Sequence, residues 1–306
     1  MIPFVREIDI VYGRRDQVSP LIQRVVADNP GPFTFTGTGT YIVGRPEPGA
    51  GVAVIDPGPP DDAHLRALLE AVDGRSVTHV LVTHTHRDHS PLARPFAGAT
   101  GATLLAARPP AHAVHASDAG DGVALEEDED DDFAPDVILT GGEVIAGDGW
   151  TIEALATPGH ASNHMAFVLG EENALFSGDH VMGWSTTVIA PPDGDMADYM
   201  ASLDAVIARN FATLWPTHGA PITAPAPFLL AYRAHRLARE TQVLERLAAG
   251  DRTIADIVPV LYAAVDRQLW PAASLSILAH LGKLTRDGRV TADPAVALDA
   301  VWSLRG

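Results

Sequence analysis

The segment VLVTHTHRDHSP, residues 80–91, carries three histidines and an aspartate within a short stretch that directly follows an apolar run. His84 and His86 are two residues apart, so on an extended backbone they point to the same side. Asp88 and His89 follow within a turn and bring four metal-ligand groups to a strand end, where α/β sheets commonly carry their sites. A lone His-x-His is usually an ordinary pair of loop side chains, whereas this denser pattern favours a metal site.

Three further apolar segments end in a residue that can bind a metal ion. ATPGH ends at His160, FSGDH contains Asp179, and WPTHG contains His218. The chain has no cysteine, so every protein ligand must be a nitrogen or an oxygen atom. Imidazole and carboxylate ligands suit zinc first, and also iron or manganese. Together the four strand ends supply enough groups for two divalent metal ions that share one carboxylate.

The order HxHxDH, then His, then Asp, then His resembles the signature of the metallo-β-lactamase superfamily. The resemblance implies the α/β fold class, as an αββα sandwich with its site in a groove at one edge of the two sheets. It also implies two sets of three metal ligands: His84, His86 and His160 for the first ion, and Asp88, His89 and His218 for the second. Asp179 would bridge the two ions, and Asp56 in IDPG would lie behind them and orient a ligand.

Such a pair of ions supports hydrolysis. Two cations about 3.5–4 Å apart can share a water molecule and lower its pKa from 15.7 to about 7. Asp88 is placed to orient this nucleophile, so we expect it to be catalytic, and no Ser, Cys or Lys nucleophile is needed. We therefore expect a dinuclear metal-dependent hydrolase that uses a metal-bound hydroxide. Asp179 stands where zinc β-lactamases have a cysteine, and His86 where the redox di-iron branch has a glutamate, which argues against both of those activities.

Residues 172–203 and YRAHRLARETQ resemble a narrower β-lactamase-like group with a winged-helix-like tail. That group contains an endoribonuclease for single-stranded RNA and acyl-carrier-protein thioesterases, and its GTNTY segment appears here as GTGTY with Gly39 in place of asparagine. The resemblance implies either hydrolysis of a thioester or ester on a small or carrier-linked acyl substrate, or cleavage of RNA. A net charge of −18 favours the acyl substrate, because nucleic-acid affinity rests largely on Lys and Arg contacts to phosphates.

Two segments are candidates for the substrate groove. Trp184 and Thr186 follow the Asp179 strand, and we expect them to form one wall. His235, Arg236 and Arg239 belong to the one dense basic cluster, which we interpret as a solvated helix face with ion pairs to Glu240. The alternative is that Arg236 or Arg239 binds an anionic group, such as phosphopantetheine or an RNA phosphate, beside the metal ions.

Apolar periodicity predicts the elements that position these residues. We expect strands at residues 33–44, 51–60, 76–84, 102–108, 150–158, 164–170, 174–179 and 212–219. The strand at 76–84 should be buried on both faces, because its β-branched residues occur on both. Capped helices are expected at 61–74 and 195–210.

The tail has a different pattern. We expect one long helix from residue 225, with Leu230, Ala234, Leu237, Thr241, Leu244 and Ala248 along its apolar stripe. Helices at 253–265 and 271–288 and a short strand then resemble a winged-helix unit. We therefore divide the chain into a hydrolase domain at 1–224 and a helical, winged-helix-like domain at 225–306. DNA binding is disfavoured, because the segment ASLSILAHLGKL in the helix at 271–288 offers one lysine and many apolar residues. We expect this helix to pack on the hydrolase domain, the body of the protein, or against a second subunit in a homodimer.

Composition excludes several classes of protein. Hydrophobic residues make up 46% and charged residues 20% of the 306, which is typical of a globular protein with a sizeable core. No apolar run reaches the roughly 18 residues that span a bilayer, and the charged N-terminus does not resemble a signal peptide. We expect a soluble, cytoplasmic protein without a membrane partner. The acidic run at 125–132 is expected to be a solvated loop.

Overall fold

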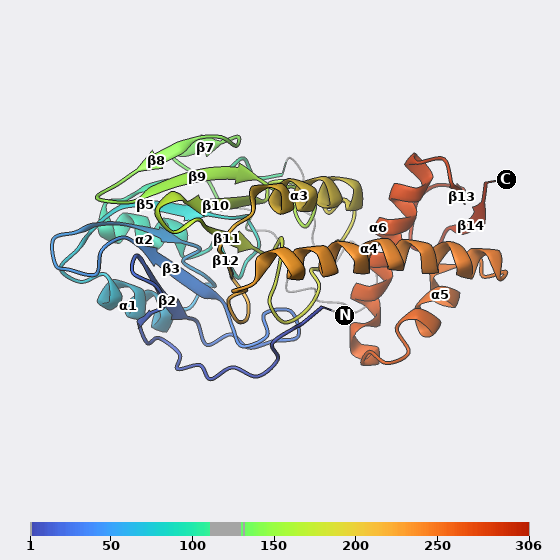
Figure 1. The fold of residues 1–306 in the computed structure, drawn as a ribbon, viewed down its shortest axis with the longest axis horizontal. Helices are drawn as coiled ribbons and strands as arrows, with labels where there is room; N and C mark the ends of the chain where they lie inside the picture. Colours follow the sequence, from blue (N-terminus) through green and yellow to red (C-terminus); the bar gives the residue numbers. More distant parts are fainter. Residues whose placement is uncertain (1, 111–129, 131, 306) are drawn as a thin grey trace.

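Two β-sheets lie face to face, and helices cover the outer face of each (Figure 1). The structure, a computed structural model, describes residues 2–110, 130 and 132–305. The first sheet has the order β1 (Asp16–Gln17), β2 (Ile22–Val26), β3 (Gly39–Val43), β4 (Gly51–Ile55), β5 (Ser76–Val82), β6 (Thr103–Ala107) and β7 (Val137–Leu139). The second has the order β12 (Thr213–Pro216), β11 (Ala174–Gly178), β10 (Met165–Leu169), β9 (Thr151–Ala156) and β8 (Val144–Ala146).

The type of strand pairing changes once within each sheet. In the first sheet β1 to β4 pair antiparallel, whereas β4 to β7 pair parallel. In the second, β12 is parallel to β11, and the remaining pairs are antiparallel. The carboxyl ends of β4, β5, β11 and β12 therefore come to one edge of the sandwich, where α/β sheets build their sites.

Three apolar clusters hold these layers together. The cluster between the sheets includes Tyr41, Phe167, Phe176 and Trp215. On the outer face of the first sheet, α1 (Asp62–Ala71) and α2 (Ala93–Thr100) pack on strand residues such as Val80. On the outer face of the second sheet pack α3 (Met196–Arg209) and the first turns of α4 (Pro225–Ala248). These layers are the expected αββα arrangement.

Strand β5 is buried on both faces, as its composition predicts. Leu81 points into the cluster between the sheets, whereas Val80 and Val82 point toward α1 and α2. A strand covered on both sides needs apolar residues at successive positions. This burial fixes the end of β5, and with it the start of the histidine-rich segment.

The C-terminal unit has its own apolar cluster. It consists of the second half of α4 with α5 (Ile254–Leu261), α6 (Trp270–Arg286), β13 (Val290–Asp293) and β14 (Val301–Leu304). Ten residues of α6 are buried, and one of them, Ala279, packs with the α3 and α4 side chains of the body. Helix α6 therefore packs on the body, which is one of the two arrangements expected for it.

The expected strand at 33–44 is correct only from Gly39 onward. Before it the chain forms a loop in which Phe35 has a positive φ of 57°. The side chain of Asn29 accepts a hydrogen bond from the amide of Thr38 at 2.8 Å and donates one to its hydroxyl at 3.0 Å. These side-chain hydrogen bonds satisfy polar groups that a strand would pair with its neighbour.

The expected apolar stripe of α4 is wrong. Leu230 is 57% exposed and Leu237 is 40% exposed. The buried positions of the helix are instead Pro225, Phe228, Leu229, Tyr232, Arg236, Glu240, Val243 and Leu247. Two charged residues lie on the buried face, so hydrophobicity alone selects the wrong side of the helix.

Smaller differences concern short elements. Helix α5 ends at Leu261, so residues 262–265 of the expected helix are not helical. The two-residue strand β1 and the edge strands β7, β8 and β14 were not expected, because segments this short carry too few residues to show a period. Most of the acidic run at 125–132 lies outside the described residues. None of the described helices is both long and apolar enough to cross a membrane.

Asp195 links the body to the C-terminal unit. Its Oδ1 accepts hydrogen bonds from the amides of Ala197 and Asp198 and caps α3, while its Oδ2 pairs with Arg286 of α6 at 2.5 Å. Burial acts to raise the pKa of Asp195, but the hydrogen bonds from Arg286 and from the two amides lower it overall.

We expect Asp195→Ala to lower the free energy of unfolding by about 1 kcal/mol, because the α3 cap is lost. Urea denaturation at pH 7 measures this change. Since the folded pKa is lowered, the difference from wild type is present above roughly pH 4 and disappears as the pH falls through the folded pKa. Arg286→Gln is the control: it removes only an exposed ion pair and should cost less than about 1 kcal/mol. Equal losses in both variants would contradict a capping role.

Candidate metal centre

All seven side chains expected to bind metal meet at the edge of the sandwich where four strands end. His84, His86, Asp88 and His89 follow β5, His160 follows β9, Asp179 follows β11, and His218 follows β12. Their ligand atoms form three overlapping groups in which all atoms lie within 4.8 Å of one another: His84 with His86 and His160, His84 with His89 and Asp179, and Asp88 with His89 and His218. The structure therefore brings the whole predicted set together.

Asp179 lies between two halves of this cluster. Its Oδ1 is 3.5 Å from His218 Nε2 and 3.7 Å from His89 Nε2, while its Oδ2 is 3.9 Å from His160 Nε2. Asp88 Oδ2 lies 3.0 Å from His218 Nε2 and 3.3 Å from His89 Nε2. The half with His89 and His218 thus contains the carboxylate of Asp88 and one oxygen of Asp179. The half with His160 contains imidazoles and the second oxygen of Asp179.

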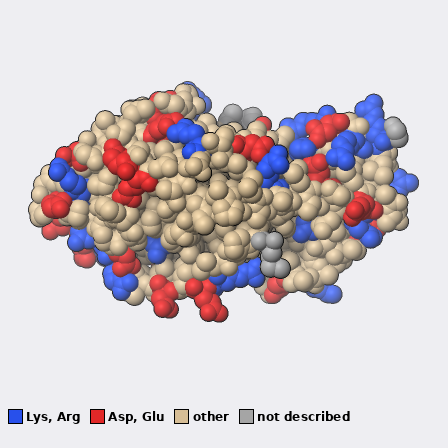
Figure 2. All heavy atoms as spheres, in the orientation of Figure 1, with Lys and Arg blue, Asp and Glu red and all other residues tan. Residues whose placement is uncertain are grey.

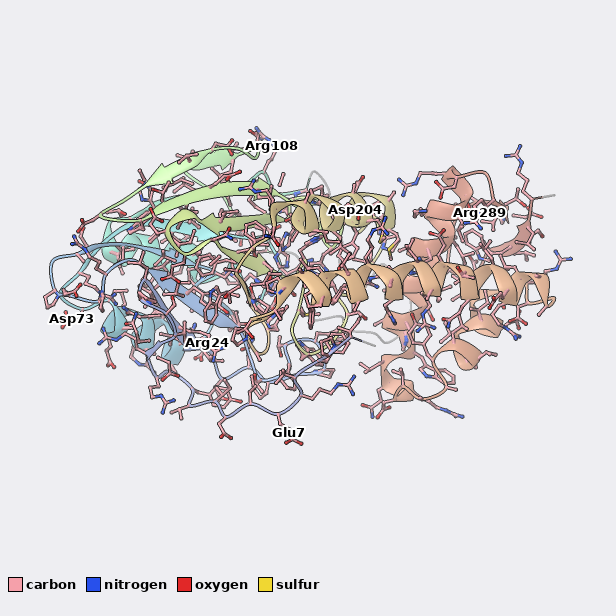
Figure 3. All side chains as sticks on the ribbon, viewed as in Figure 1. Glu7, Arg24, Asp73, Arg108, Asp204 and Arg289 are labelled. Carbon is pink, nitrogen blue, oxygen red and sulfur yellow. The ribbon has the colours of Figure 1, made fainter. Side chains whose placement is uncertain are left out.

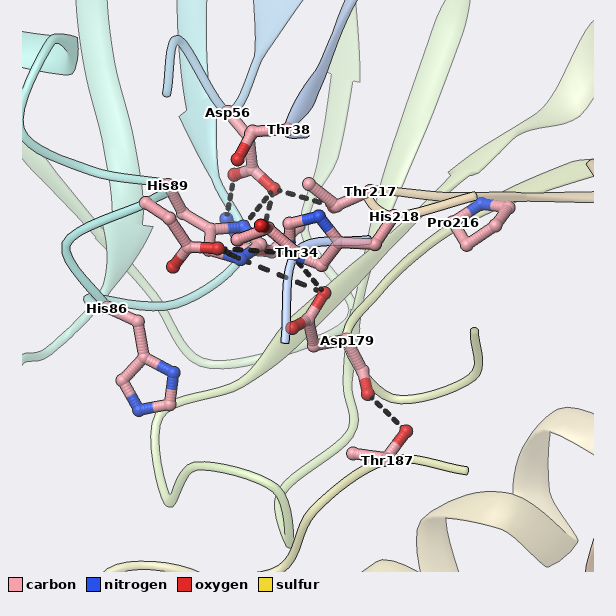
Figure 4. Close-up of polar contacts among 12 residues, drawn as sticks. Thr34, Thr38, Asp56, His86, His89, Asp179, Thr187, Pro216, Thr217 and His218 are labelled. Carbon is pink, nitrogen blue, oxygen red and sulfur yellow. Dashed lines mark hydrogen bonds and ion pairs between the residues drawn. The ribbon is translucent and has the colours of Figure 1, made fainter. Parts of the chain in front are cut away.

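Asp56 lies behind the cluster and fixes its orientation (Figure 4). Its Oδ1 accepts a hydrogen bond from the amide of Thr83 at 2.7 Å. Its Oδ2 accepts from the Thr83 hydroxyl at 2.7 Å, from His89 Nδ1 at 2.9 Å and from the Thr217 hydroxyl at 3.2 Å. Thr83 and Thr217 follow β5 and β12, so one carboxylate joins strand ends from both sheets. Neither threonine was expected, because no motif marks it.

The outer nitrogens of the histidine rings are held by the protein. His160 Nδ1 lies 2.8 Å from the Val188 carbonyl, His218 Nδ1 3.2 Å from the Gly37 carbonyl, and His84 Nδ1 3.0 Å from the Thr83 hydroxyl. A proton on the outer nitrogen leaves the inner nitrogen with a lone pair that faces the cluster.

Several inner atoms are buried without a hydrogen bond in the described part of the chain: His89 Nε2, His160 Nε2 and Asp179 Oδ1. Buried polar atoms are normally hydrogen-bonded, so these orphaned atoms need another partner. Neutral imidazoles and carboxylates converging on one point are the usual ligands of zinc and similar ions. The residues present therefore fit a divalent cation.

The two halves of the cluster differ in their protonation. Burial lowers the pKa of His86 to about 3 and also lowers that of His84 and His160, so these rings are neutral. Burial acts in the same direction on His89, but the carboxylates of Asp88 and Asp179 raise its pKa overall. Burial alone would raise the pKa of both carboxyl groups, yet the adjacent imidazoles lower it, so both are ionised. The two carboxylates thus keep a proton on His89, which a metal ion would displace on binding.

Helix α4 holds the loop that follows Asp179. The Tyr232 hydroxyl accepts a hydrogen bond from the amide of Thr187 at 2.7 Å. Arg236 Nη2 donates to the Thr187 carbonyl at 2.5 Å. The Thr187 hydroxyl in turn donates to the Asp179 carbonyl at 2.7 Å (Figure 4). The tail thus supports the cluster through this loop, a role of Tyr232 that sequence patterns did not indicate, because the contacts join segments more than forty residues apart.

A cavity of about 310 Å³ opens over the cluster. His86, Asp88, His160, Asp179 and His218 form its floor. Both segments expected to form the groove line it as well: Trp184 and Thr186 on one side, and His235, Arg236 and Arg239 of α4. Most remaining lining residues are apolar and come from four separate segments of the chain: Phe4, Pro32, Phe33, Met182, Val188, Tyr262, Val265, Leu269, Ala272 and Ala273.

The interpretation of the basic cluster as a solvated face with ion pairs to Glu240 is wrong for Arg236. Arg236 is 4% exposed and stacks on the rings of Tyr199 and Tyr232 at 4.9 and 5.8 Å from their centroids. Glu240 pairs instead with Lys283 at 2.9 Å and with Arg289 at 3.1 Å. Lys283 belongs to α6 and Arg289 lies just before β13 (Figure 3), so the acid on α4 is neutralised by residues that follow it in the C-terminal unit.

Comparison with known proteins agrees with this arrangement. The model of the metallo-β-lactamase superfamily matches residues 34–218, and that of the β-lactamase-associated winged helix domain matches residues 253–299. The chain is 31% identical over 279 residues to a β-lactamase-like protein 2 homolog of Caenorhabditis elegans, covering 90% of this chain and 88% of the relative. It is 32% identical over 299 residues to an atrochrysone carboxyl ACP thioesterase of Pseudocercospora fijiensis, covering 94% of this chain and 82% of the relative.

A solved structure has the same fold over nearly the whole chain. A β-lactamase domain protein from Burkholderia ambifaria superposes with a TM-score of 0.78 at 22% identity, covering 99% of this chain and 97% of that one. The common fold includes the C-terminal unit, which the family model identifies as a winged helix domain.

We expect Asp56→Asn to lower the free energy of unfolding by about 1–3 kcal/mol, because an amide in place of the carboxylate turns an acceptor into a donor against buried partners. Asparagine tolerates the positive φ of 49° at this position, so the loss would report on the hydrogen bonds. Urea denaturation of the purified variant measures it. Thr217→Val removes only the longest of the four bonds and should cost less. A change below about 0.5 kcal/mol in Asp56→Asn would refute this role of the carboxylate.

Proposed function

This chain belongs to the metallo-β-lactamase superfamily and is a metal-dependent hydrolase, and we propose that it cleaves the thioester or ester bond of a small or carrier-linked acyl substrate. The observation that carries the proposal is the cavity: its floor is the His/Asp cluster, and its walls are largely apolar. An acyl chain gains free energy by leaving water for apolar walls. The 32% identical relative named as an ACP thioesterase supports the same substrate class.

We propose that the cluster binds two divalent ions, zinc in the first place. His84, His86 and His160 would hold one, Asp88, His89 and His218 the other, and Asp179 would contact both. The two oxygens of Asp179 face different histidines, which supports a bridging role. When bound, the ions would supply Lewis-acid polarisation of the acyl carbonyl and a lowered pKa for water.

The chain itself contributes positioning and proton handling. Asp88 lines the cavity floor and is ionised, because the imidazoles of His89 and His218 lower its pKa. It can therefore accept a proton from an attacking water and hold that water in line with the acyl carbon. The apolar walls exclude other water molecules. A thiol leaving group has a pKa near 8.5, so it can leave as a thiolate without a proton donor, which favours a thioester over an ester.

We also propose that the two parts of the chain divide this work. Residues 1–224 would carry the metal ions, and residues 225–306 would complete the acyl cavity. Tyr262, Val265, Leu269, Ala272 and Ala273 of the tail line the cavity, which supports a substrate-binding role for the winged helix domain.

The alternative substrate, RNA, finds less support. A single-stranded RNA site combines a continuous basic groove with aromatic side chains on which bases stack. On the face shown in Figure 2 the basic and acidic side chains are interspersed, and its centre carries few charges. The net charge of −18 also repels a polyanion.

The test measures thiol release from acyl-pantetheine thioesters by zinc-loaded protein. The chain has no cysteine, so a thiol-reactive dye gives no background from the protein. We expect hydrolysis that a chelator abolishes and that added zinc restores. Asp88→Ala should lower kcat by about 10²–10⁴-fold, the usual contribution of a positioned general base.

Two controls separate the possible outcomes. Asp62→Ala, at an exposed position on α1 remote from the cavity, should keep wild-type activity. An end-labelled, unstructured RNA is incubated in parallel with wild type and with Asp88→Ala. Cleavage of the RNA by wild type alone, together with no hydrolysis of any thioester or ester, would overturn the proposed substrate class.

A further inference from the structure

We propose that Arg236 and Arg239 form a subsite for an oxyanion of the substrate, a carboxylate or a phosphate, in the part of the cavity bounded by α4. The proposal rests on the proposed function and deepens it, because it specifies that the preferred substrate is charged. Both arginines line the same cavity as the His/Asp cluster. One bound molecule can therefore contact the cluster and the arginines together.

Arg236 is a buried cation that has more donors than partners. Its Nη2 reaches the Thr187 carbonyl, but its Nε is buried without a hydrogen-bond partner among the residues described. Stacking on Tyr199 and Tyr232 compensates part of the desolvation of the guanidinium group. The Nε–H therefore lacks a partner, which an anionic ligand would supply.

Arg239, one turn further along α4, is arranged in the same way. Its Nη1 donates to the Leu261 carbonyl at 3.1 Å, and its guanidinium lies over the Tyr262 ring, 4.3 Å from the centroid. Its Nε is likewise buried and has no partner in the described structure. Tyr262 lines the cavity too, so the ring and the carbonyl hold the guanidinium at the cavity wall.

Neither cation has a carboxylate partner within the described ranges. Two other arginines of α4 do: Arg233 pairs with Asp204 of α3 at 2.5 Å, and Arg246 pairs with Asp251 at 2.6 Å. In a chain with 39 acidic and 21 basic residues, two unpaired cations side by side are unusual. A buried charge without a counter-charge is costly, and an anionic ligand would remove that cost.

Among the described residues, the neighbours of the pair on α4 and α6 offer no carboxylate that is free of another partner. Burial, and then the charges of Arg236 and Arg239, lower the pKa of His235 to about 4, so this neighbour is neutral at pH 7. His280 of α6 faces the same two cations, and burial first and then their charges keep its pKa well below its usual value. Glu240, the acid on the same face of α4, is held by Lys283 and Arg289. A bound oxyanion would thus be the counter-charge of the pair.

The test compares thioesters that differ by one charged group, using metal-loaded protein. Pentanoyl-pantetheine is the neutral reference. Pentanoyl-4′-phosphopantetheine adds a phosphate to the thiol part, and glutaryl-pantetheine adds a carboxylate to the acyl part. The readout is the ratio of kcat/KM for each charged substrate to that for the reference, in wild type, in Arg239→Gln and in the control Arg233→Gln. Arg233 lies on the same helix but pairs with Asp204, which is on the α3 surface (Figure 3).

We expect wild type to prefer at least one charged substrate, and Arg239→Gln to reduce that ratio by about 10- to 100-fold, the usual effect of a charge-assisted hydrogen bond. Arg233→Gln should keep the wild-type ratio. Preference for the phosphorylated substrate would show that the subsite binds a phosphate on the thiol part of the substrate. Preference for the glutaryl substrate would show that it binds a carboxylate on the acyl part. Equal kcat/KM for charged and neutral substrates in wild type, or an unchanged ratio in Arg239→Gln, would overturn the subsite.

A binding measurement keeps this result separate from the proposed function. Calorimetry compares 4′-phosphopantetheine with pantetheine, and glutaric acid monoamide with pentanamide. The metal ions are the same in wild type and Arg239→Gln, so a difference between the two proteins reports on the arginine. If no thioester is hydrolysed, the proposed function fails, yet weaker binding of a charged compound to Arg239→Gln would still support the subsite. Equal affinities of the two proteins for both charged compounds would overturn it.

Discussion

One buried carboxylate holds the candidate site together. Asp56 accepts four hydrogen bonds, from the Thr83 amide and hydroxyl, from His89 Nδ1 and from the Thr217 hydroxyl. Thr83 follows a strand of the first sheet and Thr217 one of the second, so the carboxylate joins the two sheets where the metal-ligand side chains emerge. A buried anion needs all of these donors, which leaves the strand ends and the His89 ring little freedom to move.

Helix α4 and the C-terminal unit support the edge of the sandwich that carries the candidate site. Helix α4 holds the loop after Asp179 through Tyr232 and Arg236, and the C-terminal unit neutralises Glu240 on the same helix. The tail also supplies much of the apolar wall of the cavity. A winged helix domain, often associated with nucleic acids, here covers a hydrolase centre. The winged helix domain would select the substrate, whereas the residues that bind the metal ions belong to the αββα sandwich.

The metal-ligand set could be predicted from the sequence because its spacing is local and each remaining ligand ends an apolar strand. His84, His86, Asp88 and His89 lie within one six-residue segment. His160, Asp179 and His218 each lie at the end of a strand that the apolar periodicity predicts. The groove was harder to predict. Arg236 lies on a buried face of α4 that apolar patterning misassigns, because burial there comes from stacking on Tyr199 and Tyr232. Phe4 and Phe33 reach the cavity through tertiary contacts alone, which no local pattern encodes.

We propose that Asp179 divides the cluster into two metal sites. The most direct test is a crystal structure of zinc-loaded protein with anomalous scattering recorded at the zinc edge, together with the zinc content per chain. We expect two anomalous peaks, one beside His84, His86 and His160 and the other beside Asp88, His89 and His218, with a carboxylate oxygen of Asp179 toward each. A single peak at full zinc occupancy, or peaks away from Asp179, would contradict it.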